Sequence, residues 1–227
     1  MKYYKRYYNI ISLVIIACLI MAYVEVIITP TYFVKSLVKL LIFGIVPIIY
    51  SLINKNTHLK EIFHFKLKPF ILSLLIGVGV YVLIIGGYVI LDKYYDLSNV
   101  PSLLENNLGI NKDNFILVAI YISMINSFLE EFFFRGFAYF SLKNISTKKI
   151  ANIFSALAFS LYHIAIIDGW FQFTLTFFII VGLFISGIFF NYLNEKSKSI
   201  FPSWLVHIFA NFAINTIGIY LFKILGA

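Results

Sequence analysis

The chain has 227 residues, of which 61% are hydrophobic and only 12% are charged. This composition excludes an ordinary soluble domain, in which about a quarter of the residues are charged. A formal net charge of +8 would suggest nucleic-acid binding in a soluble protein. Here the basic residues fall mainly between apolar runs, so membrane topology explains them better and we expect no nucleic-acid partner. The single cysteine, Cys18, excludes an intramolecular disulfide framework.

Apolar runs of about 20 residues recur along the chain, long enough to cross a hydrocarbon core about 30 Å thick. We therefore predict an all-α fold, a polytopic helix bundle in the lipid bilayer that forms a single membrane domain over residues 1–227. The predicted spans are 9–28, 32–53, 69–91, 114–140, 149–167, 170–193 and 201–222. The first span is longer than the apolar core of a signal peptide and lacks a convincing cleavage site, so we interpret it as a retained helix.

Prolines and loop residues add detail to these spans. Pro47 is expected to kink the second span, and Pro202 suits the first turn of the last one. Residues 100–110 are either a short amphipathic helix on the membrane surface or a plain connector.

The distribution of basic residues predicts the orientation. Segments on the side of the N-terminus carry twelve Lys and Arg residues, whereas those on the other side carry only Lys93, Lys112 and Lys223. Basic loops stay in the cytoplasm, so we expect a cytoplasmic N-terminus and an external C-terminus.

Polar residues inside the spans are the main functional signal. The fourth span carries Glu130, Glu131 and Arg135 within six residues. An ionised side chain in the bilayer costs roughly 2.5 to 3.5 kcal/mol even on mild scales, so such groups are expected to have a function. His163 follows on the fifth span, and His207 and Asn211 follow on the last.

Depth estimates place these groups in one zone. A rise of about 1.5 Å per residue puts Glu130 roughly 15 Å and His163 roughly 20 Å from the cytoplasmic side. The same rise puts His207 and Asn211 roughly 8 and 14 Å from that side. We therefore expect a site in the inner half of the bilayer.

Helical spacing separates the roles of the two glutamates. Glu131 and Arg135 are four residues apart and can pair on one face, while Glu130 points about 100° away towards a neighbouring helix. His207 and Asn211 also share a face. Phe159 lies one turn before His163 and would pack against its ring.

Simpler interpretations exist for each residue alone. Arg135 could snorkel to the interface, Asn211 could join two helices, and a membrane histidine could be a packing residue. Two adjacent carboxylates at depth have no comparable structural explanation. His58 and His64, in the basic second loop, are assigned to the solvated surface.

Together these groups favour hydrolysis by an activated water. A buried carboxylate beside a histidine, Glu130 with His163, can take a proton from water. The tetrahedral oxyanion then needs preorganised donors, which His207 and Asn211 can supply. Glu131 paired with Arg135 would support the helix.

The same residues carry a family resemblance. Glu130–Arg135 reads EEFFFR, Phe159–His163 reads FSLYH, and His207–Asn211 reads HIFAN. In this order the motifs resemble the CPBP (Abi) family of intramembrane proteases, which includes the type II CAAX prenyl endopeptidases and bacteriocin-processing or immunity proteins. The resemblance implies a catalytic core at about 114–222. It implies that Glu130 and His163 activate water and that His207 and Asn211 form the oxyanion site. Glu131, Arg135 and Phe159 would then be supporting residues.

The need for a metal is left open. The family is commonly labelled metalloprotease, and Glu130, His163 and His207 could ligate zinc. The chain has no HExxH motif, and asparagine is an unusual zinc ligand, so we favour a mechanism without a cofactor.

The predicted function is therefore an intramembrane endopeptidase with a cavity open to the cytoplasm and a peptide or membrane-protein substrate. Richness in Ile, Phe, Tyr, Asn and Lys suits an AT-rich bacterial genome, which favours a bacterial cytoplasmic membrane and a pheromone or bacteriocin precursor as substrate. Two alternatives remain: a non-catalytic immunity or binding protein, and a small proton-coupled transporter.

Overall fold

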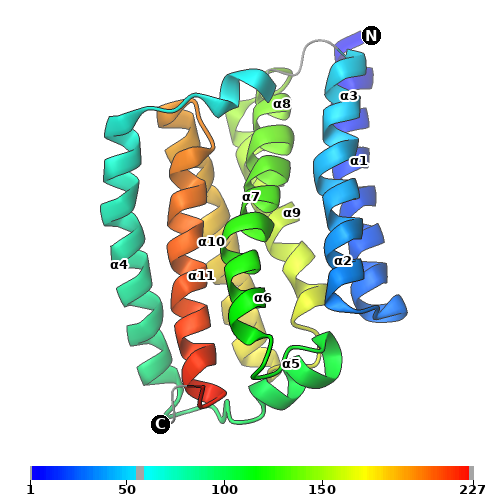
Figure 1. Cartoon of the computed structure of the whole chain (residues 1–227). Coiled ribbons are helices and arrows are strands. Elements are labelled where there is room, and N and C mark those ends of the chain that lie inside the picture. Colours follow the sequence, from blue (N-terminus) through cyan, green and yellow to red (C-terminus); the bar gives the residue numbers. More distant parts are fainter. Residues whose placement is uncertain (1, 55–58, 225–227) are drawn as a thin grey trace. The chain divides into compact units, whose positions relative to one another are not determined.

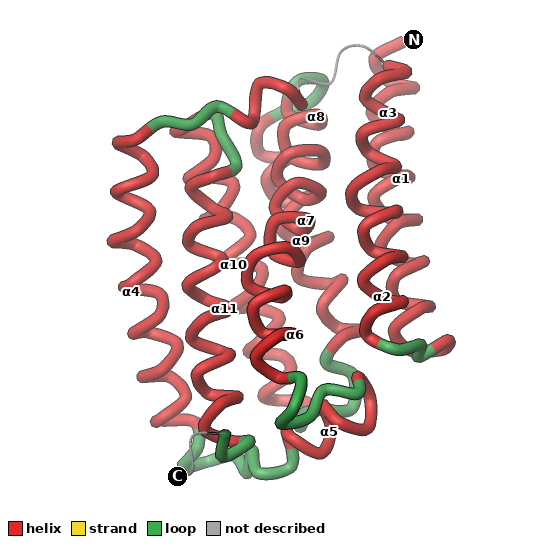
Figure 2. The backbone as a smooth tube through the Cα atoms, in the orientation of Figure 1, coloured by secondary structure: helices red, strands yellow, loops and turns green. Residues whose placement is uncertain are grey.

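The computed structural model describes residues 2–54 and 59–224, with side chains from residue 5 onwards. Within these ranges every regular element is a helix (Figures 1 and 2). Seven helices in the described part of the chain are long and apolar enough to cross a membrane. They are Lys5–Ile28, Tyr32–Asn54, Leu67–Leu91, Phe115–Lys143, Lys148–Ile166, Phe173–Ser197 and Phe201–Leu221. The predicted all-α class and the seven spans are confirmed, whereas the cytoplasmic N-terminus stays a prediction.

Four spans are single α-helices and three change their winding along their length. The single helices are α4 (Leu67–Leu91), α9 (Lys148–Ile166), α10 (Phe173–Ser197) and α11 (Phe201–Leu221). The first two spans consist of α1 (Lys2–Tyr23) with η1 (Val24–Ile28), and of α2 (Tyr32–Lys39), η2 (Leu40–Ile45) and α3 (Val46–Asn54). The fourth span consists of α6 (Phe115–Tyr121), η4 (Ile122–Asn126), α7 (Ser127–Glu130), η5 (Glu131–Tyr139) and α8 (Phe140–Lys143). Two short helices, η3 (Leu59–Phe63) and α5 (Val100–Leu108), lie between spans.

The segments η1, η2, η4 and η5 are wound as π-helices, which apolar periodicity did not predict. Pro47 explains the winding of η2. A proline has no N–H to donate, and its ring clashes with the carbonyl of the residue four positions earlier, here Phe43. The wider turn of η2 ends at Ile45, two residues before the proline, and the kink of this span stays a prediction.

The described contacts divide the chain into two compact units. Unit 1 comprises Met1–Phe65 and Leu129–Phe201, and unit 2 comprises Lys66–Phe128 and Pro202–Ala227. Of the three boundaries, the first falls just before α4, the second inside the fourth span and the third at the start of α11. The single membrane domain expected from the sequence stays a prediction.

In unit 1, helices α9 and α10 run antiparallel to one another (Figure 1). A Cβ on Gly187 would lie only 2.9 Å from the Cα of Ala156, so the glycine allows the two backbones to approach. One turn along, Asn191 Nδ2 donates to Asn152 Oδ1 at 2.9 Å. This packing sets the position of α9 and, with it, that of His163.

The core of unit 1 is aromatic and surrounds η5, whose nine residues are all buried. The ring of Phe43 from η2 stacks on that of Phe133 from η5, with centroids 4.1 Å apart and planes 2° from parallel. Phe134 meets Phe159 of α9 edge to face at 5.4 Å. These contacts fix the second, fourth and fifth spans against one another through the turn that follows Glu130.

Unit 2 is built around α11. Helix α4 runs parallel to it: Phe209 fills the space left by Gly77, and Tyr81 bonds to Thr216 at 3.0 Å (Figure 1). The segment α6–η4 runs antiparallel to α11 and meets its polar face. Pro202 lies in the first turn of α11, as predicted.

Two loop predictions can be compared with the structure. Residues 100–108 form the helix α5, which begins with Pro101 in its first turn and ends at Gly109 with φ +66°. The helical interpretation is therefore confirmed, and its placement on the membrane surface stays a prediction. His64 is exposed as expected, and His58 lies outside the described residues.

Candidate active site

Glu130 is the centre of the candidate site in unit 1. Its side chain is only 2% exposed, at the end of α7 and directly before the first wide turn of η5. One carboxylate oxygen, Oε1, lies 2.6 Å from Lys39 Nζ. The other, Oε2, lies 3.8 Å from His163 Nε2. Glu130 and His163 therefore lie close together, as predicted. Lys39 contacts Glu130 from the other side of the carboxylate.

The hydrogen bond of His163 determines which ring nitrogen faces Glu130. His163 Nδ1 lies 2.7 Å from the carbonyl oxygen of Phe159, four residues earlier on α9. A carbonyl only accepts hydrogen bonds, so Nδ1 must carry the proton. In a neutral ring Nε2 then presents a lone pair towards Oε2 of Glu130. The predicted packing of Phe159 is also present, edge to face at 4.7 Å.

The gap between Glu130 and His163 suits one bridging water. At 3.8 Å, Oε2 and Nε2 are too far apart for a good direct hydrogen bond. Both atoms are acceptors when His163 is neutral and Glu130 ionised, and a water has two hydrogens to donate. A contact longer than about 3.5 Å is a common place for such a water.

Lys39 is the residue of this site that sequence reasoning missed. It is the last residue of α2, and its side chain is 7% exposed. Its ammonium lies 5.0 Å from the centroid of the Tyr162 ring and 5.7 Å from that of Phe43. The signal that could have found it is its position inside a predicted span, because a buried lysine in a membrane is as costly as a buried glutamate.

Glu131 and Arg135 form the pair that their spacing predicted. Glu131 Oε1 lies 3.2 Å from Arg135 Nη1, and both side chains are fully buried. The guanidinium stacks on Phe159 of α9, 4.0 Å from the ring centroid, and lies 5.0 Å from the centroid of Phe190 on α10. Cation–π contacts of this kind stabilise a desolvated arginine. The pair therefore holds three spans together, and Arg135 does not snorkel.

A third ion pair lies one turn away from Lys39 on the same helix. Lys35 Nζ is 2.7 Å from Glu25 Oε2, and the two side chains are 6% and 11% exposed. Sequence reasoning missed this pair as well. In the three pairs each carboxylate has its own cation, so these six side chains add no net charge to the interior of unit 1.

His207 and Asn211 lie in unit 2, on a polar face of α11 that also carries Trp204 and Asn215. His207 is 8% exposed. Asn211 Nδ2 donates to the carbonyl oxygen of Ile122 at 3.3 Å, in the π-turn η4. The two residues share a face as expected, and the asparagine also joins two helices. Their meeting with Glu130 and His163 stays a prediction.

The neighbours of Asn211 on this face bind residues in η4 and on either side of it. Asn215 Nδ2 donates to Ser123 Oγ at 2.9 Å and to the carbonyl of Ala119 at 3.1 Å. Trp204 Nε1 donates to Ser127 Oγ at 3.1 Å. A π-turn shifts backbone carbonyls out of the regular ladder, and side chains of α11 supply donors to them.

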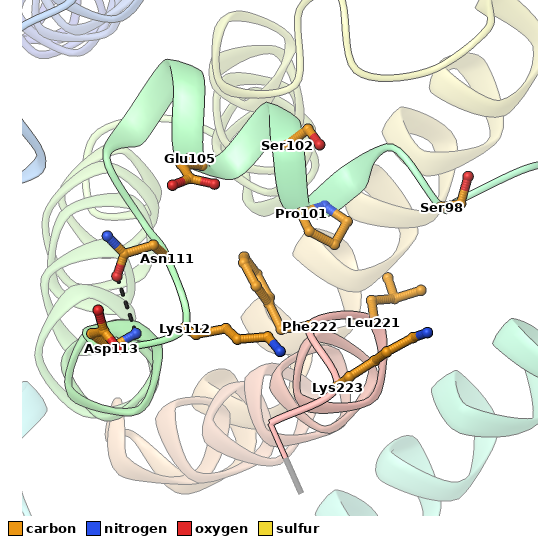
Figure 3. Close-up of a pocket in the computed structure, with 10 residues that line it drawn as sticks. All are labelled: Ser98, Pro101, Ser102, Glu105, Asn111, Lys112, Asp113, Leu221, Phe222 and Lys223. Atoms are coloured by element: carbon orange, nitrogen blue, oxygen red, sulfur yellow. Dashed lines mark hydrogen bonds between the residues drawn. The ribbon is translucent and has the colours of Figure 1, made fainter. Parts of the chain in front are cut away.

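Unit 2 also contains a pocket of about 590 Å³ at the end of α11 (Figure 3). Helix α5, the following loop and the end of α11 line it. Its charged residues are of both signs, Glu105 and Asp113 with Lys112 and Lys223. None of the predicted catalytic residues lines this pocket.

Among the described residues, no group of three or more His, Cys, Asp and Glu side chains lies close enough to hold a metal ion. Within unit 1 only Glu130 and His163 of the suggested zinc ligands are present. A dication bound to Glu130 would lie within a few Å of the ammonium of Lys39, and the repulsion would oppose its binding. Unit 1 by itself supplies only two of the protein ligands that a zinc site needs, and the expected absence of a metal stays a prediction.

Comparison with known proteins gives one match. Residues 112–213 match the family model described as Rce1-like, type II CAAX prenyl endopeptidase Rce1-like. This range contains all seven residues singled out from the sequence. No curated protein and no solved structure matches the chain.

Proposed function

Residues 112–213 match the model of the Rce1-like type II CAAX prenyl endopeptidases, and from this match we propose that the membrane protein is an intramembrane endopeptidase. It would use a water held by Glu130 and His163. The observation that carries the proposal is the pair of facing acceptors, Glu130 Oε2 and His163 Nε2, 3.8 Å apart in a buried site. A water that donates one hydrogen to each of them directs a lone pair outwards, towards a substrate carbonyl.

The proposed reaction begins with this water. Glu130 takes a proton from the water as its oxygen attacks the carbonyl carbon, and a C–O bond forms. His207 and Asn211 donate to the oxyanion of the tetrahedral intermediate. Transfer of the proton from Glu130 to the amide nitrogen lets the C–N bond break, which gives a carboxylic acid and an amine and restores the Glu130 carboxylate. Glu131 and Arg135 hold the helix that positions Glu130.

The mechanism needs no metal. What supports this part of the proposal is Lys39, whose ammonium already provides a positive charge 2.6 Å from Glu130 Oε1. A carboxylate paired with an ammonium can act as a base, while binding of a dication at the same carboxylate would be opposed.

The substrate is a peptide or membrane protein that reaches the bilayer. The excess of basic residues on the N-terminal side supports a site open to the cytoplasm of a bacterial cell. A pheromone or bacteriocin precursor fits that setting, and the family description supports a C-terminal segment as the alternative.

Comparative peptidomics tests the proposal. Cells carrying the wild-type chain are compared with cells carrying Glu130→Gln, and Glu195→Gln serves as the control. Glu195 is also a paired carboxylate, held by Lys143 at 2.6 Å on α8, but it does not touch Glu130 or His163. We expect peptides that disappear in Glu130→Gln and persist in Glu195→Gln. Identical peptide profiles at equal protein levels would contradict proteolysis and favour an immunity or binding role.

A further inference from the structure

We propose that Lys39 is a positioning residue of the active site, which holds the carboxylate of Glu130 so that Oε2 faces His163. The inference rests on the proposed function of Glu130. Lys39 lies outside residues 112–213, the range that matches the family model. The second span, for which the sequence suggested no role in the site, thus contributes directly to it.

The contact itself is a buried ion pair. Lys39 Nζ and Glu130 Oε1 are 2.6 Å apart, with side chains 7% and 2% exposed. Either charge without its partner would destabilise the protein strongly, because both side chains are buried. The two residues are 91 positions apart in the chain, and their pair joins the second span to the fourth.

The backbone on both sides of the pair is fixed by aromatic packing. Phe43, one turn after Lys39, stacks on Phe133, which follows Glu130 by three residues. The ammonium also lies within 5.0 Å of the Tyr162 ring centroid, next to His163 in sequence. The lysine is therefore held by the same three spans that hold the catalytic pair.

The two oxygens of Glu130 have different partners, and this determines what Lys39 does. The terminal torsion of a glutamate is broad, so the carboxylate alone can rotate. Binding Oε1 to Lys39 restricts this rotation and leaves Oε2 towards His163. Misplacement of a reacting group by about 1 Å can cost about 100-fold in rate.

Lys35 provides a matched control for this role. It lies one turn before Lys39 on α2, is buried to a similar extent, and is paired with Glu25 at 2.7 Å. Replacing Lys35 removes the same charge from the same helix and from an equally short ion pair. Of these two lysines, Lys39 is the one that pairs with Glu130.

Turnover of a substrate peptide, in protein purified in lipid, separates positioning from folding. We expect Lys39→Met to lower kcat by about 100-fold with KM within about threefold, because alignment and not binding is lost. Lys35→Met should keep kcat within about threefold. Lys39→Arg, which keeps the charge, should be at least tenfold faster than Lys39→Met. Wild-type kcat in Lys39→Met, or an equal loss in Lys35→Met, would overturn the inference.

A stability cycle tests the pair without any substrate. Lys39→Met and Glu130→Gln should each lower Tm by roughly 5 °C or more, and the double variant should recover at least half of the larger loss. If Lys39→Met does not accumulate, restored accumulation in the double variant supports the pair. If the double variant loses as much Tm as the two single variants together, the inference is overturned. The double variant could recover Tm while the wild-type protein cleaves no peptide. This result would contradict the proposed function but would still support the ion pair of Lys39 and Glu130.

Discussion

His163 Nδ1 donates a hydrogen bond to the carbonyl oxygen of Phe159, 2.7 Å away on the preceding turn of α9. The other ring nitrogen, Nε2, therefore faces Glu130 Oε2 at 3.8 Å without a proton when the ring is neutral. A helix of ordinary geometry thus sets the tautomer of the histidine. The backbone of α9 therefore orients His163, one of the two residues proposed to hold the water.

Removing this imidazole tests its part in the chemistry. We expect His163→Ala to lower kcat by about 100-fold or more, since general acid–base groups contribute about 10² to 10⁴. His64→Ala, at an exposed histidine, is the control and should leave turnover unchanged. Steady-state kinetics with a Tm measurement checks both. Near-normal turnover in folded His163→Ala would show that the ring does not act on the water.

Asn211 and Asn215 differ in their expected effects. Both amides bind α6–η4, but only Asn211 is assigned to the oxyanion. We expect Asn211→Ala to lower kcat by about 100-fold or more, as for the loss of an oxyanion donor. Asn215→Ala should instead lower stability by about 1 kcal/mol with little effect on kcat. Thermal unfolding and kinetics of the two variants make the comparison. The reverse pattern would assign Asn211 to helix packing only.

Two glycines on α10 test the packing that positions His163. A Cβ at Gly187 would lie 2.9 Å from the Cα of Ala156, whereas nothing lies within 4 Å of one at Gly182. We expect Gly187→Ala to destabilise the protein by about 1 to 3 kcal/mol, because backbone must move. Gly182→Ala should be neutral or slightly stabilising, since alanine favours a helix. Equal Tm values would mean that α9 and α10 are not closely packed here.

Most of the fold follows from the sequence, because length and apolarity determine which helices can span a bilayer. The pairing of Glu131 with Arg135 follows in the same way from their spacing. Lys39 was missed because helical spacing reveals only partners on the same helix. Its partner, Glu130, is 91 residues away. The π-turns were missed because apolar periodicity does not distinguish a π-turn from an α-turn. The π-turn η2 precedes Pro47, whereas η5 lies in the packed aromatic core of unit 1.

Chelation distinguishes the two mechanisms proposed for the family motifs. Because Lys39 occupies one side of Glu130, we expect turnover to survive prolonged treatment with a strong chelator, with no stoichiometric zinc in the purified protein. Elemental analysis of the same sample is the required control. Loss of activity on chelation, restored by zinc at micromolar concentration, would contradict the metal-free mechanism.

The central claim is that Glu130 activates the water that cleaves the substrate. Its most direct test is the turnover number of purified Glu130→Gln on a peptide identified in cells, beside wild type and Glu195→Gln in the same lipid. We expect a fall of at least about 1,000-fold in folded Glu130→Gln and near-normal turnover in Glu195→Gln. Turnover of Glu130→Gln within tenfold of wild type would contradict it.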